Sequence, residues 1–170
     1  MASNVDAPAP ELPGLVIVPA DERHIDAMMV VMHAAFDPQY GEAWSAAQLL
    51  ATMAMPGCWA RLAMRGGQAV GFSLCRAVVD EVELLLIAVA PDARRQGAGS
   101  RLLLRAQEDA LARGGSLLFL EVREDNEAAR CLYQSLGFAV IGRRADYYSG
   151  KDGSRRAAIT MRFGLDKLQA

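Results

Sequence analysis

Residues 94–99 read Arg94-Arg95-Gln96-Gly97-Ala98-Gly99, and this stretch decides the fold because it separates an apolar run from an amphipathic one. Glycines at the start of a helix let backbone N–H groups approach a ligand closely, and a helix N-terminus favours negative charge. Arginine side chains add cationic donors that match phosphate oxygens. The stretch therefore predicts a pyrophosphate-binding loop. A glycine-rich turn with solvated arginines explains the hexapeptide equally well.

The segments on either side of this loop predict a strand and a helix. Residues 82–89, VELLLIAV, are a nearly unbroken apolar run, typical of a central strand covered on both faces. Residues 97–113 place leucine and alanine on one helical face and stop at a glycine pair, a common C-terminal signal. A dinucleotide-binding fingerprint is disfavoured, because its three-glycine spacing is absent and the preceding strand is the third predicted strand rather than the first.

The chain before this strand predicts two helices and a hairpin. Apolar residues recur at three- and four-residue steps across 21–36, which indicates a helix with one apolar face. Ser45 and Gln48 form a capping-box pair that announces a second, short helix. Two strands, near 58–64 and 69–79, flank a glycine-containing turn and are typical of a β-hairpin.

The complete order of predicted elements is ααβββαβαββ, which favours a mixed sheet with helices on both faces, of the α/β or α+β class. Residues 1–14 contain three prolines among small polar residues and predict a loose tail, which leaves 15–170 as a single domain. The elements expected after the loop helix are a strand at 116–122, a helix at 126–136, and strands at 138–147 and 156–163.

The composition narrows the possible functions. A chain of 170 residues fits one domain, and 18 basic against 20 acidic residues disfavour a nucleic-acid binder. No run approaches the ~18 apolar residues of a membrane-spanning helix, and the N-terminus lacks the features of a secretory signal. Three scattered cysteines favour a reducing compartment, and two histidines are too few for an obvious metal site. We therefore expect a cytoplasmic protein without metal, nucleic-acid or membrane partners.

The loop also resembles a known family signature. Residues 94–99 are similar to the R/Q-x-x-G-x-G/A pattern of GNAT acetyltransferases, where it grips the pyrophosphate of acetyl-CoA. Ile87-Ala88-Val89-Ala90-Pro91 precedes it as is usual in that family. Downstream, Asn126, Ala128-Ala129 and then LYQSLGF at 132–138 resemble the family's second half.

This resemblance covers roughly residues 15–163 and implies the GNAT fold, a mixed, mostly antiparallel sheet splayed at its middle strands. It implies acetyl-CoA as the co-substrate, with backbone groups of residues 87–89 binding its acetyl and pantetheine portion. Ordinary sheet pairing of the same backbone is compatible with that role. The residues that the resemblance assigns to acetyl-CoA are Ile87, Ala88, Val89, Arg94, Arg95, Gln96, Gly97, Ala98, Gly99, Ser100 and Asn126.

The resemblance also implies the catalytic residues. Glu121 would be the general base, acting through water, and Tyr133 the general acid that protonates the departing thiolate. Asn126 lies two helical turns before Tyr133 and would hold the pantetheine arm. Glu121 could instead be a strand-end carboxylate paired with Arg123 or another cation, and Tyr133 could simply pack in the core. Direct transfer is preferred to a covalent acetyl-enzyme at Cys131, because a lone cysteine without a nearby histidine is usually a small buried hydrophobe.

Within the family, the chain is similar to the RimI type, which acetylates the N-terminal alanine of a small-subunit ribosomal protein. That likeness implies a protein N-terminus as the partner, with Trp44, Tyr147 and Tyr148 near the peptide. The two tyrosines could equally be sheet residues with solvated hydroxyls. Ala43 stands where this type usually has proline, and Leu86 where asparagine is common. A small-molecule amine, a lysine side chain, and a non-catalytic acyl-CoA-binding module remain alternatives.

Overall fold

The computed structural model describes residues 14–149, 153 and 155–168, so the predicted tail lies outside the described residues except for Gly14. The described strands are β1 (Leu15–Ala20), β2 (Cys58–Arg65), β3 (Gln68–Val78), β4 (Glu81–Val89), β5 (Leu117–Arg123), β6 (Ala139–Ser149) and β7 (Arg155–Gly164). The helices are α1 (Ile25–Ala35), α2 (Ala46–Met53), α3 (Ala98–Ala112) and α4 (Glu127–Ser135), with 3-10 turns η1 (Glu22–His24), η2 (Pro38–Tyr40), η3 (Pro91–Ala93) and η4 (Leu165–Leu168).

The predicted elements are present, and one strand was missed. Each predicted strand appears within two residues of its expected bounds, and the capping box of Ser45 and Gln48 begins α2. The missed strand, β1, carries Pro19 and lies at one edge of the sheet. An edge strand tolerates proline because one side of the strand has no neighbour that needs its N–H.

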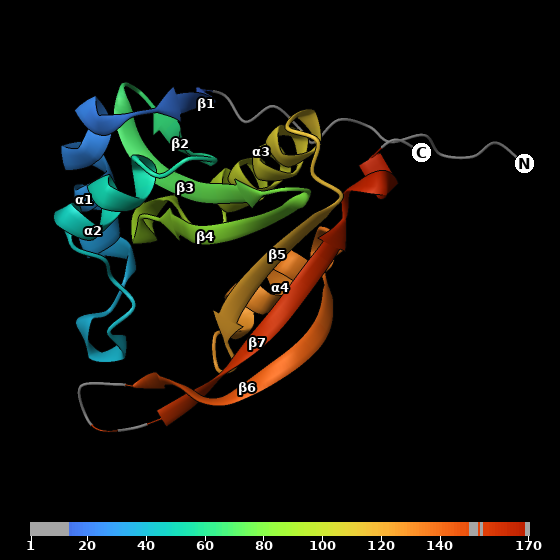
Figure 1. Ribbon diagram of the computed structural model, residues 1–170. Coiled ribbons are helices and arrows are strands. Elements are labelled where there is room, and N and C mark those ends of the chain that lie inside the picture. The colour runs from blue at the N-terminus through green and yellow to red at the C-terminus, as the bar shows by residue number, and fades with distance from the viewer. Residues whose placement is uncertain (1–13, 150–152, 154, 169–170) are drawn as a thin grey trace, which may run out of the picture.

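All seven strands form one sheet in the order β1-β2-β3-β4-β5-β7-β6. Neighbouring strands are antiparallel except β4 and β5, which run parallel. Their pairing covers only residues 81–84 with 117–120. Figure 1 shows the two strands close together at their N-terminal ends and diverging toward their C-terminal ends. The predicted sheet, mixed, mostly antiparallel and splayed at its middle strands, is therefore confirmed.

A β-bulge in β4 accompanies this divergence. Leu84 pairs with Cys75 and Leu86 pairs with Leu74, so that Leu85 is an extra residue in β4. An extra residue reverses the alternation of side chains between the two faces of a strand. Leu84 accordingly packs in the cluster that contains α3 and α4 residues, whereas Leu86 packs in the cluster that contains α1 and α2 residues.

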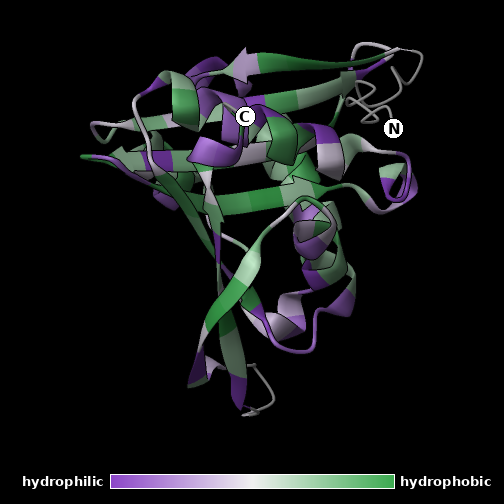
Figure 2. Ribbon diagram, turned by 90° about the vertical axis from the view of Figure 1, so that its right-hand side faces the viewer, coloured by the Kyte–Doolittle hydropathy of each residue, from purple (hydrophilic) through white to green (hydrophobic). Residues whose placement is uncertain are grey.

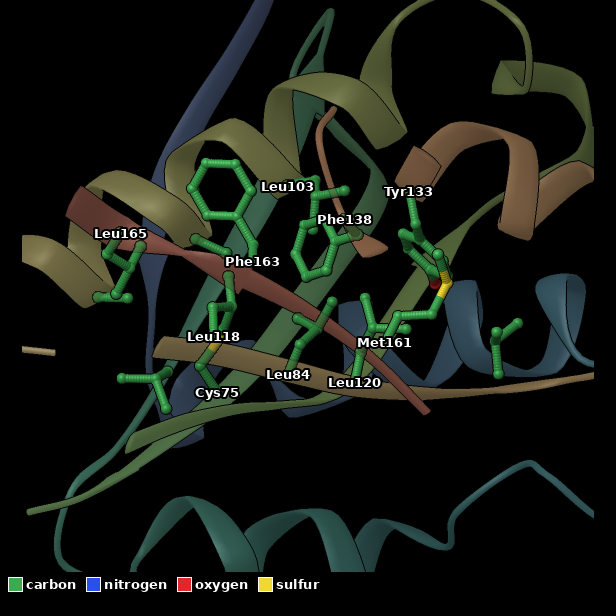
Figure 3. Close-up of a cluster of buried hydrophobic side chains, with 14 of the residues drawn as sticks. Cys75, Leu84, Leu103, Leu118, Leu120, Tyr133, Phe138, Met161, Phe163 and Leu165 are labelled. Carbon is green, nitrogen blue, oxygen red and sulfur yellow. The ribbon is translucent and has the colours of Figure 1, made fainter. Parts of the chain in front are cut away.

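Helices cover both faces of the sheet, as predicted. α1 and α2 pack on β2, β3 and β4 through Met28, Met32 and Leu49, while α3 and α4 pack on the opposite face. Figure 2 shows the strands through the middle of the sheet as mostly hydrophobic, with hydrophilic residues more frequent on the helices. Figure 3 shows Tyr133 in the same cluster as Phe138 and Met161, which joins α4 to β7. In the described ranges 14–149, 153 and 155–168, no helix is long and apolar enough to span a membrane.

An ion pair between α3 and β2 supports this packing. Arg61 donates two hydrogen bonds of 2.7 Å to Asp109, whose side chain is only 8% exposed. Arg105 also contacts Asp109 at 3.2 Å. Removing one member of a buried pair leaves the other charge in a poorly solvated position, which is strongly destabilising.

We expect Arg61→Met to lower the free energy of unfolding by about 2 kcal/mol, somewhat less than for a fully isolated pair because Arg105 remains beside Asp109. Urea denaturation measures this change. The matched control is Arg143→Met, which breaks a comparable two-bond pair with Glu124 at the surface and should cost no more than about 1 kcal/mol. Equal losses in the two variants would show that the Arg61–Asp109 pair has no special role.

Candidate active site

A cavity of about 930 Å³ opens where β4 and β5 diverge. Its volume falls in the range of small-molecule sites. Its walls come from the second half of β4, the end of β5, the start of α3, one face of α4, part of β6 and the segment between α1 and α2. The predicted site residues that line it are Trp44, Ile87, Ala88, Val89, Arg94, Arg95, Gly97, Gly99, Ser100, Glu121, Asn126, Tyr133, Tyr147 and Tyr148.

The wall formed by β4 presents backbone as well as side chains. Residues 87–89 pair with β3 along one edge of the strand. Beyond Leu84 the other edge has no strand partner among the described residues, because the ladder to β5 has ended. Ile87 and Val89 are half-buried rather than fully covered, since they line the cavity. The second half of β4 is therefore only partly covered, and the backbone groups of its free edge can bind a ligand.

The loop before α3 is built on two left-handed residues. Arg95 has φ 58° and Gly97, which caps the helix, has φ 81°. Gly97, Gly99 and Ser100 all line the cavity, so the first turn of the 15-residue helix α3 faces it. A Cβ on Gly99 would lie 3.2 Å from a methyl group of Leu132 on α4, which explains why glycine stands where the two helices approach. The arrangement can bind an anion at the helix N-terminus.

The two loop arginines differ in their contacts. Arg94 donates to the carbonyl oxygens of Val89, at 3.2 Å, and Ala35, at 2.8 Å, and so ties the loop to β4 and to the end of α1. Arg95 has no side-chain hydrogen bond within the part of the chain that the structure describes. Arg95 is therefore the more available cation for a phosphate, while Arg94 mainly holds the loop in place.

Two predicted site residues direct their side chains away from the cavity. Gln96 accepts a hydrogen bond from Arg65 at 2.5 Å and donates one to the carbonyl oxygen of Asp92 at 2.7 Å. Ala98 is buried in the cluster that contains Leu15. Neither residue lines the cavity. Any contact they make with a ligand would use their backbone N–H groups.

Tyr133 is buried at the base of the cavity on α4. Its ring packs 6.0 Å from that of Phe138, so the predicted core packing is real, and the residue also lines the cavity. Burial raises the pKa of the Tyr133 hydroxyl, and the nearby Tyr148 and Glu42 raise it further. Tyr133 is therefore protonated at neutral pH and can donate a proton.

Glu121 lies near the end of β5, on the wall opposite β4. Arg144 on β6 donates to its Oε1 at 2.9 Å, so the predicted alternative of a paired carboxylate is observed, with Arg144 as the cation rather than Arg123. A hydrogen bond with Glu121 raises the pKa of Tyr147, and Arg144 stacks over the Tyr147 ring at 4.1 Å. The side chain of Glu121 remains 22% exposed and lines the cavity.

Asn126 caps the helix α4, in addition to its predicted role in binding the pantetheine arm. Its Oδ1 accepts a hydrogen bond of 3.2 Å from the backbone N–H of Ala129, which caps the N-terminus of α4. The side-chain NH₂ group, which carries two donors, is not used by that cap. Asn126 lines the same cavity as Tyr133, so it can cap the helix and donate to a ligand at once.

The predicted acceptor residues gather at the side of the cavity nearest β6. Tyr147 and Tyr148 are in edge-to-face contact, with ring centroids 5.0 Å apart. The β6–β7 register shifts between Arg144 and Tyr148, and Asp146 has φ 54° within that irregularity. The bulge brings two adjacent tyrosines of one strand to the same cavity. Trp44 reaches it from the segment before α2.

The cavity-lining residues that sequence reasoning missed include Tyr40, Glu42 and Arg123. Tyr40 and Glu42 lie in an irregular segment without periodicity, and Arg123 was considered only as a partner for Glu121. The adjacent Trp44-Ser45 pair was the one signal nearby. In the described part of the chain, no group of three His, Cys, Asp or Glu side chains could hold a metal ion.

The fold and the site together define the class. A splayed mixed sheet whose cavity joins a helix N-terminus to a buried tyrosine is the arrangement expected of an acetyl-CoA-dependent transferase. The sequence model of the acetyltransferase (GNAT) family matches residues 26–138, and the chain belongs to that family. Acetyl-CoA is the co-substrate that this family uses.

Individual relatives of this chain have a more specific name than that of the family. The chain is 41% identical over 92 residues to the [ribosomal protein bS18]-alanine N-acetyltransferase of Haemophilus ducreyi, covering 54% of this chain and 63% of that protein. It is 42% identical over 95 residues to the Escherichia coli enzyme of the same name, covering 56% and 64%. The alignments thus span slightly less than two thirds of these relatives. The crystal structure of the Escherichia coli ribosomal-protein-S18-alanine N-acetyltransferase superposes with a TM-score of 0.81 at 31% identity, covering 89% of this chain and 94% of that one.

We expect Gly97→Ala to weaken acetyl-CoA binding about tenfold, because a side chain in the left-handed region costs roughly 1–2 kcal/mol and would distort the loop at the helix N-terminus. Isothermal titration calorimetry measures the Kd. Gly114→Ala is the matched control, since Gly114 has φ 82° beyond the other end of α3 and open space around its Cβ position. Equal weakening in both variants would mean that the loop geometry does not govern binding.

Proposed function

We propose that this protein transfers an acetyl group from acetyl-CoA to the N-terminal α-amine of a protein, by direct transfer in a ternary complex. The proposed acceptor is the N-terminal alanine of a small-subunit ribosomal protein. The main support for this reaction is that a single cavity is lined by the N-terminus of α3, by Tyr133 and by Glu121. The acceptor is supported by the names of the relatives at 41 to 42% identity.

Each end of the cavity supports one half of this reaction. The turn at Gly97, the first turn of α3 and Arg95 fit the diphosphate of acetyl-CoA, since they combine backbone donors with a cation. The half-buried wall at 87–89 fits the extended pantetheine arm, and its unpaired edge can polarise a carbonyl oxygen. Acetyl-CoA supplies the activated acyl group as a thioester.

The proton transfers are assigned to two residues that line the cavity. Glu121 takes up the proton of the acceptor amine through a water molecule, and Tyr133 protonates the departing thiolate. Tyr133 suits this role because its phenol holds a proton at neutral pH and lines the same cavity. Cys131 is exposed on α4 and does not line the cavity, which supports direct transfer over an acetyl-cysteine intermediate.

The acidity of the acceptor favours an α-amine. A backbone α-amine has a pKa of about 8, so neutralising it at pH 7 costs roughly 1.4 kcal/mol. A lysine side chain with a pKa near 10.4 costs roughly 4.6 kcal/mol for the same step. One carboxylate acting through water, as proposed for Glu121, is better matched to the smaller cost.

The release of free CoA, followed with a thiol reagent, tests this proposal on three acceptors. These are a ribosomal peptide that begins with alanine, a lysine peptide with a blocked N-terminus, and a panel of small amines. We expect turnover on the first, with little on the others. Turnover restricted to small amines or to the lysine peptide would overturn the acceptor. Tight acetyl-CoA binding without any turnover would indicate a binding module and overturn the reaction.

Tyr133→Phe should lower kcat at least about a hundredfold, the lower range for loss of a general acid, while the Kd of acetyl-CoA stays within about twofold. Phenylalanine keeps the ring that packs on Phe138, so the fold is retained. Tyr148→Phe removes a hydroxyl from the same cavity and is the control, with a much smaller expected loss. Equal kcat values for wild type and Tyr133→Phe would remove Tyr133 from the mechanism.

We further propose that residues 15–170 act as one acetyltransferase domain in the cytoplasm, with a protein N-terminus as the partner. A single sheet from Leu15 to Gly164 supports the domain, and a ribosomal acceptor supports the location.

A further inference from the structure

The segment between α1 and α2 extends from the first half of the sheet toward the second and then returns (Figure 1). It leaves α1 at Ala35, passes through η2 and enters α2 at Ala46. Figure 1 shows this segment extending from the α1–α2 side toward the strands β6 and β7. Tyr40 and Glu42, both within it, line the cavity opposite the loop that precedes α3. The segment therefore forms a wall of the acceptor half of the cavity.

Arg123, the last residue of β5, binds this wall through its side chain. Its side chain is only 9% exposed, and its guanidinium binds both Glu42 and Asp125. The same guanidinium lies 3.6 Å from the centre of the Tyr40 ring, and Arg156 on β7 lies 4.8 Å from it. A buried arginine with two carboxylates and an aromatic face fixes the position of each partner.

Glu42 is held so that part of its carboxylate stays available. The hydrogen bond and ion pair from Arg123 both reach Oε2, and no described residue bonds to Oε1. The side chain is 17% exposed, and it lines the cavity. Burial raises the pKa of Glu42, while Arg123 opposes that rise. Glu42 lines the same cavity as Tyr133 and Tyr148, and its charge adds to burial in raising the pKa values of both tyrosines.

Glu42 and Glu121 thus approach the acceptor half from different walls. Glu121 comes from β5 and is paired with Arg144, whereas Glu42 comes from the segment before α2 and is paired with Arg123. Both raise the pKa of Tyr148, so Tyr148 lies within electrostatic reach of both carboxylates. A cationic group entering between them would meet a carboxylate on each side.

We propose that Glu42 is a specificity-determining residue that receives the ammonium group of the acceptor through its free oxygen, and that Arg123 positions it. The inference rests on the proposed function, because it assumes that an amine enters this half of the cavity. An ammonium group can donate to the free oxygen of this partly buried carboxylate, whereas an anionic acceptor would be repelled by its charge. The same attraction stabilises the protonated amine, so its deprotonation is left to Glu121. Glu42 therefore acts on acceptor binding rather than on the chemical step.

The test is Glu42→Gln, which keeps the shape of the side chain and removes its charge. Steady-state kinetics should show the KM for the Ala-initiated peptide raised about tenfold, with kcat and the KM for acetyl-CoA changed less than about twofold. Glu42→Asp, which keeps the charge on a shorter side chain, should recover part of the loss. The matched control is Glu124→Gln, which neutralises a carboxylate near the same strand end that pairs with Arg143 and does not line the cavity.

The split between KM and kcat separates this role from others. A merely structural role would lower the melting temperature of Glu42→Gln and change the KM for both substrates together, which would overturn the inference. A fall in kcat at unchanged peptide KM would also overturn it, by placing Glu42 in the chemical step. Failure of the proposed function is seen separately, in the wild-type enzyme. If the wild type acetylates only small amines, a tenfold rise in their KM would still support Glu42 as the ammonium site, and an unchanged KM would refute it.

Discussion

The end of the β4–β5 ladder after Leu84 and Leu120 is the constraint on which the site depends. Two parallel strands that separate within a sheet expose backbone donors and acceptors that no neighbouring strand satisfies. Helices pack on both halves beside the opening, α1 and α2 against β2, β3 and β4, and α4 against the half formed by β5 and β7. One apolar cluster that includes α3 joins the two halves at the end where β4 and β5 still pair. The bulge at Leu85 directs Leu86 and Ala88 into the cluster that contains α1 and α2 residues.

Polar contacts join the two halves of the sheet in addition to the apolar cluster that runs from β3 and β4 through α3 to β5 and β7. Gln107 on α3 donates to the carbonyl oxygen of Leu136 at the end of α4, and Arg123 at the end of β5 binds Glu42 before α2. These contacts are buried or half-buried, so loss of either partner leaves an unsatisfied group. A few specific polar interactions therefore add to the apolar core in fixing the cavity walls.

The conformation of the loop before α3 follows its sequence more closely in the backbone than in the side chains. Gly97 caps α3 in a left-handed conformation and opens the helix N-terminus to the cavity, as its position before an amphipathic helix indicated. The side chains of the same loop are less predictable. Gln96 turns to Arg65 and Arg94 to two backbone carbonyls, because those partners come from strands and helices distant in the sequence.

The sequence by itself determined the strands from β2 to β7, the helices and the loop before α3, because periodicity, capping pairs and glycine positions act over a few residues. It also placed Tyr133 and Glu121 on a helix and a strand end. The tertiary structure decided the rest. It placed β1 at the edge of the sheet despite Pro19, formed the bulge at Leu85 and paired Glu121 with Arg144. It also joined the segment between α1 and α2 to the end of β5 through Arg123. These features depend on groups far apart in the chain, and only packing of the whole sheet brings such groups within hydrogen-bond distance.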